Sequence, residues 1–187
     1  MVEAVVRIRG TDVLVREGDL FASRSNWPSS WLMAMLNAGA SHVTTVVSVD
    51  GKLRSVGVCA DAWVDCEGVE WPAGITREPL ELFNDATYLN CWHVRPWRPR
   101  TVAQNVAMRL CVCAMYEKDC HDGKIYDSWM EFLYSCLGWM PATKNRFHCS
   151  EFASYLALQA GAWPAEKTTS VGIVECVRTI GVATKIY

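Results

Sequence analysis

The sequence predicts an α+β fold, with a hairpin-rich first half and a helix-rich second half. Three observations lead to this prediction. Residues 1–10 and 42–60 alternate apolar and polar side chains with the period of two that is typical of strands. Residues 101–118 and 149–160 repeat apolar residues with the helical period. No internal repeat, low-complexity tract or linker interrupts the chain, so residues 1–187 are expected to form a single domain.

Short strands and one helix are expected before residue 40. The strands predicted here are residues 1–10, 13–15 and 20–22, separated by turns around Gly10 and Gly18. Residues 29–38 are then expected to be helical. Ser29 or Ser30 can cap this helix, and its residues Trp31, Met35 and Ala38 lie near one face.

Residues 42–60 form the best hairpin signal in the chain. Asp50-Gly51 suits a type I′ turn, which requires positive φ at both central residues. A two-residue turn pairs Val49 with Lys52, and counting back places His42 opposite Cys59. The period of two then puts Gly57, Cys59 and Asp61 on the face of His42.

The remaining elements follow from apolar spacing and from glycine and proline. They are a loop or short strand over 62–79, a helical turn over 79–84, a strand over 89–95, helices over 101–118, 126–137 and 149–160, a loop over 138–145, and a weakly strand-like segment over 171–185. In the first long helix Thr101 is the expected cap. The residues spaced for burial there are Val102, Val106, Leu110 and Cys113.

Charge and cysteine usage limit the classes of partner. The net charge of −2 and the pI near 6.1 give no global reason to expect nucleic acid or anionic membrane. The basic residues of 95–100 are interrupted by prolines and indicate a solvated loop. Nine cysteines leave at least one thiol unpaired in any intrachain disulfide scheme. Without a signal-like or membrane-spanning apolar stretch, a reducing, cytoplasmic location is expected, and export by another route stays open.

The sharpest chemical signal is a cysteine at the start of a helix. Cys149 opens the segment 149–161, where unpaired N–H groups and the helix dipole stabilise a thiolate. Far upstream, His42 begins an apolar strand. A thiolate on a helix and a base on a distant strand are the parts of a thiol hydrolase, with a buried structural cysteine as the alternative.

The residues around these two positions resemble the NlpC/P60 superfamily of papain-like thiol hydrolases. Cys149-Ser150-Glu151-Phe152 is close to the Cys-Ser-Glu signature that opens the family's cysteine helix. Glu17–Phe21, Ser41–Val47 and Tyr126-Asp127 resemble further family motifs, although Thr44 stands where glycine is usual. The histidine strand precedes the cysteine helix here, as in the circularly permuted branch. The resemblance covers residues 17 to 161 and implies a permuted papain-like fold.

The resemblance also implies roles for individual residues. Cys149 is the nucleophile and His42 the general acid/base. The next strand of the family supplies a group that orients the imidazole, and Asp61 is the candidate here if the strand continues or bulges by one step. Cys59, a backbone carbonyl or a water are the alternatives. Tyr126 lies near the nucleophile and can donate to the oxyanion, or can serve only in packing.

No cofactor or metal is expected. Cys111 and Cys113 point about 200° apart on a helix, so they cannot join Cys120 and His121 around one zinc ion.

The implied reaction is hydrolysis of an amide through a thioester on Cys149. The substrate would be a small peptide or amide such as a cell-wall peptide. Two alternatives stay open: a lipid acyl thioesterase or acyltransferase of the same architecture, and a catalytically silent binding domain associated with a virion or acting as an effector. The oligomeric state is left open.

Overall fold

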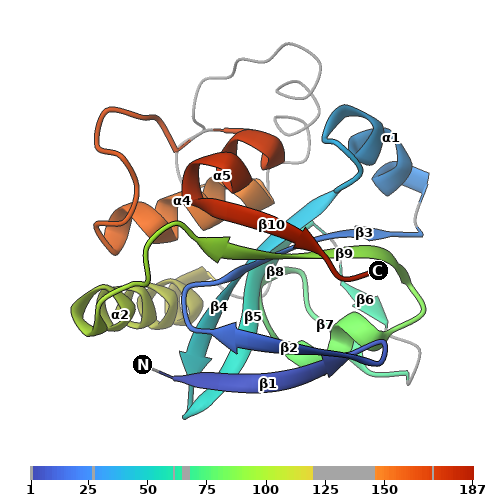
Figure 1. Cartoon of the computed structure of the whole chain (residues 1–187), viewed down its shortest axis with the longest axis horizontal. Coiled ribbons are helices and arrows are strands. Elements are labelled where there is room, and N and C mark those ends of the chain that lie inside the picture. Colours follow the sequence, from blue (N-terminus) through green and yellow to red (C-terminus); the bar gives the residue numbers. More distant parts are fainter. Residues whose placement is uncertain (1, 27, 61, 65–67, 120–145, 170) are drawn as a thin grey trace.

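A computed structural model describes residues 2–26, 28–60, 62–64, 68–119, 146–169 and 171–187. Its centre is a six-stranded sheet in which all pairings are antiparallel (Figure 1). In spatial order the strands are β10 (Gly181–Lys185), β9 (Tyr88–Pro96), β3 (Leu20–Ser25), β4 (His42–Val49), β5 (Lys52–Cys59) and β8 (Gly74–Pro79). Two small hairpins accompany it: β1 (Glu3–Ile8) with β2 (Thr11–Arg16), and β6 (Trp63–Val64) with β7 (Glu70–Trp71).

Helices complete the α+β architecture that the sequence predicts. They are α1 (Pro28–Leu36), α2 (Val102–Asp119), α4 (Cys149–Gln159), α5 (Ile173–Ile180) and the 3₁₀ helix η1 (Leu80–Asn84). None of the helices in the described ranges is long and apolar enough to cross a membrane. The helix predicted over 126–137 and the loop over 138–145 lie outside the described residues.

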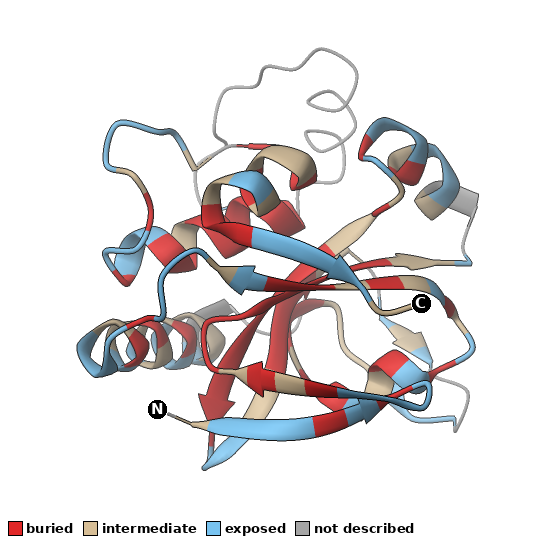
Figure 2. Cartoon of the chain, viewed as in Figure 1, coloured by how far each residue is buried: buried red, intermediate tan, exposed pale blue. Residues whose placement is uncertain are grey.

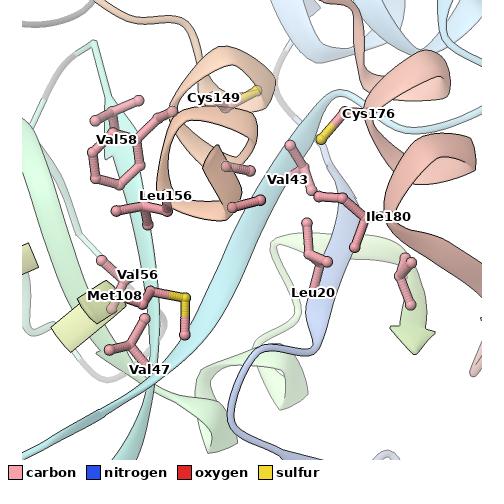
Figure 3. Packing of buried hydrophobic residues seen from close by; sticks show 14 of the residues in the cluster. Leu20, Val43, Val47, Val56, Val58, Met108, Cys149, Leu156, Cys176 and Ile180 are labelled. Atoms are coloured by element: carbon pink, nitrogen blue, oxygen red, sulfur yellow. The ribbon is translucent and has the colours of Figure 1, made fainter. Parts of the chain in front are cut away.

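The two faces of the sheet contribute to two different hydrophobic clusters. On the helix face, Val43, Val47, Val56 and Val58 pack against α2, α4 and α5 (Figures 1 and 3). On the hairpin face, Val46 and Phe21 pack with residues of β1, β2 and η1. Because side chains alternate along a strand, each residue of β4 belongs to one face only. This assignment decides which candidate site residues can meet.

The β4–β5 hairpin forms with the predicted turn and register. Asp50 and Gly51 have φ of 50° and 76°, as a type I′ turn requires, and Val49 pairs with Lys52. Most of β4 is buried, because helices cover one face and the β1–β2 hairpin lies over the other (Figure 2).

The orientation predicted for α2 is wrong. Its N-terminal cap is the predicted one, since the Gln104 N–H donates to Thr101 Oγ1 and the Thr101 N–H to Gln104 Oε1. However, the residues expected to be buried are exposed: Val102, Val106, Leu110 and Cys113. Met108 and Val112 enter the core instead.

A salt bridge between Arg109 of α2 and Glu17 accompanies this rotation of the helix. Arg109, next to Met108, forms two hydrogen bonds to the buried Glu17 carboxylate. The Arg109 guanidinium stabilises the charged form of this buried carboxylate, so this pair and the Met108 contact favour the same helix rotation. The spacing of apolar residues alone could not distinguish the two faces.

The C-terminal segment also departs from the prediction. Residues 171–185 were expected to be weakly strand-like, yet α5 occupies the first part and β10 only the end. The buried residues Ile173, Cys176 and Ile180 are three and four apart, which is the spacing of one helix face. In the segment 62–79, the short-strand alternative is confirmed by β6, β7 and β8. The helical turn expected over 79–84 is η1.

Candidate functional site

Cys149 is the first residue of α4, as the sequence predicts. The preceding His148 is the N-cap, and its Nδ1 accepts a hydrogen bond from the Glu151 N–H at 3.4 Å. Ser150 Oγ lies 2.9 Å from the same Nδ1 and donates to the Val171 carbonyl at 2.7 Å. The carboxylate of Glu151 in the first turn is favourable to the helix dipole. These contacts fix where α4 begins and therefore where Cys149 lies.

The Cys149 side chain is fully buried in the helix-face cluster. Its exposed fraction is 0%, and the same cluster contains Val43, Val58, Phe152 and Cys176 (Figure 3). A nucleophile must be reached by its substrate, and a thiol surrounded by core residues is normally inert. The position at the helix start is thus the predicted one, and Cys149 belongs at the same time to the hydrophobic core of the helix face.

His42 lies at the start of β4 on the opposite face of the sheet. A Cβ added at Gly57 would lie 2.8 Å from Thr44 Cγ2 and 3.3 Å from His42 Nε2, so the imidazole covers the side of β5 toward which that Cβ would point. The neighbours Val56 and Val58 point the other way, into the cluster that contains Cys149. The prediction that Gly57 shares the face of His42 is therefore confirmed.

The structure does not bring the predicted nucleophile and base together. Cys149 packs on the helix face and the His42 ring lies over Gly57 on the hairpin face. Between these two described side chains there is no hydrogen bond. Asp61 and Tyr126, the other two candidate catalytic residues, lie outside the described residues. Cys59, the alternative orienting residue, is the last residue of β5 and is half-buried.

His42 is half-buried at the start of β4, and the loss of solvent around its ring affects its protonation. This burial lowers the pKa of the imidazole to about 4. The ring is therefore neutral at pH 7 and can accept a proton only weakly. A thiolate next to the ring would have the opposite effect, because a negative charge favours the imidazolium.

A buried polar group around His42 was not predicted from the sequence. Thr44 and Ser55 are joined by a 2.6 Å hydrogen bond between their hydroxyls, and Ser55 pairs with Glu78 of β8. Burial raises the pKa of Glu78 to about 7, an effect that the nearby Thr76 and Trp63 side chains partly offset. The one sequence signal for this group was the strand period of two, which places Ser55 and Gly57 on the same face of β5.

A second group of charges ties the turn before β3 to the rest of the fold. Asp19, in the turn around Gly18, accepts from the Arg16 N–H at 2.9 Å and also lies 2.7 Å from His93 Nε2. Arg100 is buried against Gly18, where any Cβ would overlap its side chain. The prediction of a solvated loop over residues 95–100 is therefore wrong for Arg100. Burial lowers the pKa of its guanidinium, while the Asp19 carboxylate acts in the opposite direction.

The residues weighed for a zinc site do not form one in the described part of the chain. No group of three or more potential metal-binding side chains occurs among the described residues. Cys111 is half-buried and Cys113 is exposed, and Cys120 and His121 lie outside the described residues.

Comparison with known proteins adds no identification. No protein-family model matches the chain, and no curated protein has a significantly similar sequence.

Proposed function

We propose that the chain is a papain-like domain of the permuted NlpC/P60 type that binds a small peptide or amide and is catalytically silent. One observation carries this proposal: His42 Nε2 lies over Gly57, on the face of the sheet away from Cys149. A general base must come within hydrogen-bond reach of its nucleophile, directly or through one water. The proposal rests on the assignment of the two side chains to opposite faces of the β4–β5 part of the sheet.

The surroundings of His42 support the same proposal. Gly57 has no side chain with which to orient the ring, and among the described residues no carboxylate acts on the pKa of His42, which burial alone lowers. Without an orienting group, the tautomer of a catalytic histidine is poorly fixed. With this arrangement, a domain of the family's architecture would lack the aligned Cys149–His42 pair that its catalysis needs.

A thiol hydrolase acting on amides is the second candidate. Its supporting observation is that α4 begins at Cys149, with a histidine cap and an acidic first turn, as the cysteine helix of such enzymes requires. This candidate needs a conformation in which the imidazole of His42 reaches the helix face. The lipid acyl thioesterase or acyltransferase would use the same two residues on an ester or thioester substrate.

Alkylation of the thiols by iodoacetamide separates the silent domain from both enzymes. The silent domain predicts that Cys149 reacts more slowly than the exposed Cys113 at pH 6 to 8, and that His42→Ala leaves its rate unchanged. Peptide mapping by mass spectrometry measures each thiol separately. Preferential labelling of Cys149 below pH 8, slowed by His42→Ala, would establish the ion pair and favour the hydrolase.

Substrate panels then test what the domain does with a ligand. Muropeptides and acyl esters are offered to the wild-type protein and to Cys149→Ala, with binding followed by calorimetry and products by mass spectrometry. The silent domain predicts equal binding by both proteins and no turnover by either. Turnover of muropeptides would indicate an amidase, whereas turnover of acyl esters would indicate the lipid enzyme.

A further inference from the structure

The helix α1 exposes most of its large apolar residues to solvent. Its inner side carries Ala34, which is buried, together with the half-buried Met33 and the half-buried Ser30, whose Oγ lies 2.5 Å from Ser25 Oγ. Its solvent side carries large apolar residues, whose exposed fractions are 53% for Trp31, 47% for Leu32, 78% for Met35 and 42% for Leu36. Surface helices normally have the reverse pattern.

These four side chains form one continuous surface. Positions 31, 32, 35 and 36 fall within an arc of about 140° when each residue turns the helix by about 100°. We call Trp31, Leu32, Met35 and Leu36 the α1 patch. The outward turns of α1 are drawn as exposed at the upper right of Figure 2. A continuous apolar surface of this kind marks an interaction site.

The described contacts place two cations near the α1 patch. From Leu20 to Val49 the sequence contains no Asp or Glu, and Arg24 is its only Lys or Arg. The Arg24 guanidinium lies over the Trp31 ring, 4.2 Å from its centroid. Beyond the other end of α1, Gly39 lies against Trp92, over whose ring the Lys185 ammonium lies at 5.9 Å.

A second exposed stripe on α2 differs in its electrostatic setting. Val102, Val106 and Leu110 are exposed there, but none is aromatic, and Glu117 lies on the same helix. The α2 stripe therefore lacks both the tryptophan of the α1 patch and the arginine that lies over that tryptophan.

We propose that the α1 patch lies on the surface of a lipid bilayer that carries anionic headgroups, with Arg24 and Lys185 at the headgroup level. An uncharged, nine-residue helix with Trp, Leu and Met outward can bury this face at the boundary between headgroups and acyl chains, but it is too short to span a bilayer. The cation over Trp31 suits the phosphate and carboxylate groups just above that boundary. The low net charge of the chain makes this attraction local rather than global.

Vesicle sedimentation tests the proposal on the full chain. Vesicles of phosphatidylcholine alone are compared with vesicles that contain one quarter phosphatidylserine. We expect the wild-type protein to bind the anionic vesicles more strongly. Leu32→Glu with Met35→Glu should weaken binding at least about tenfold, because two charges then enter the apolar layer. Arg24→Gln should weaken binding to the anionic vesicles by about fivefold and change binding to neutral vesicles little.

The matched control is Val102→Glu with Leu110→Glu, which adds two charges to the α2 stripe and should leave binding unchanged. Circular dichroism and thermal melting establish that each variant folds. Absence of wild-type binding to anionic vesicles overturns the proposal, as does equal loss in the control variant. A concentration-dependent dimer that Met35→Glu dissociates, without vesicle binding, would instead make the α1 patch an interface between two copies of the chain.

Discussion

The two faces of the central sheet differ in what they bury. The helix face is a continuous apolar core, which includes Cys149 and the valines of β4 and β5. The hairpin face combines an aromatic cluster around Phe21 with the buried polar group formed by Thr44, Ser55 and Glu78. Cys149 therefore lies where packing dominates, whereas His42 lies where hydroxyls and a carboxyl are buried.

The difference shows how strongly a catalytic geometry depends on strand parity. His42 and Val43 are neighbours in sequence, yet one faces the hairpin side and the other packs in the cluster of Cys149. A shift of one residue in a strand moves every side chain to the other face. A motif of the correct residue types in the correct order can thus fail to assemble a catalytic pair.

The largest expected effect concerns packing on the helix face. Leu156→Ala removes a fully buried side chain of α4 and should lower the free energy of unfolding by about 2–5 kcal/mol. Leu158→Ala, on the same helix but 38% exposed, should cost less than about 1 kcal/mol. Urea denaturation of both variants measures the difference. Similar costs for the two variants would mean that α4 does not pack on the sheet through Leu156.

The next effect tests the crowding on the hairpin face. Gly57→Ala should destabilise the fold by about 1–3 kcal/mol, because the new methyl group would lie 2.8 Å from Thr44 Cγ2. Thr44→Ser removes that methyl group and keeps the hydroxyl that bonds to Ser55. The double variant should therefore recover part of the loss, as a denaturant-based double-mutant cycle can measure. Additive costs would contradict the contact.

The smallest effect is a pair of opposing pH dependences on the hairpin face. His42, with its pKa lowered to about 4, makes stability rise with pH between about 4 and 6.5, because the unfolded chain binds the additional proton. Glu78, with its pKa raised to about 7, makes stability fall with pH between about 4.5 and 7, because in this range the folded chain binds a proton that the unfolded chain has released. The two slopes nearly cancel in the wild-type protein.

Single substitutions should reveal each slope. When the pH is raised from 5 to 6, the free energy of unfolding of His42→Gln should fall by about 1 kcal/mol, because only the Glu78 slope remains. The free energy of unfolding of Glu78→Gln should rise by about the same amount, because only the His42 slope remains. Denaturation at the two pH values, with the wild-type protein as reference, gives both numbers. Parallel profiles for all three proteins would mean that neither group is shifted by burial.

Local patterns predicted much of the fold. The Asp50-Gly51 turn determined the β4–β5 register, and the Thr101 cap marked the start of α2 correctly. The rotation of α2 could not be predicted, because it depends on the pairing of Arg109 with Glu17, which is far away in sequence. The same limit applies to α5, whose helical face is defined by its packing against the core.

The candidate site shows the same division between local and distant information. The position of Cys149 at the start of α4 followed from local signals. The position of His42 relative to Cys149 depends on which face of the sheet the helices cover, and that is a property of the whole topology. The buried polar group likewise contains residues of three strands, Thr44 of β4, Ser55 of β5 and Glu78 of β8. The sequence indicated only a loop or a short strand where β8 lies.

The separation of Cys149 from His42 is tested most directly by the pKa of His42 in solution. NMR titration of the imidazole signals, assigned with His42→Gln, is carried out on the wild-type protein and on Cys149→Ser. The account predicts a His42 pKa of about 4 in both proteins, because burial alone lowers it. A pKa above about 6.5 in the wild-type protein that falls in Cys149→Ser would reveal a thiolate beside the ring and would contradict the account.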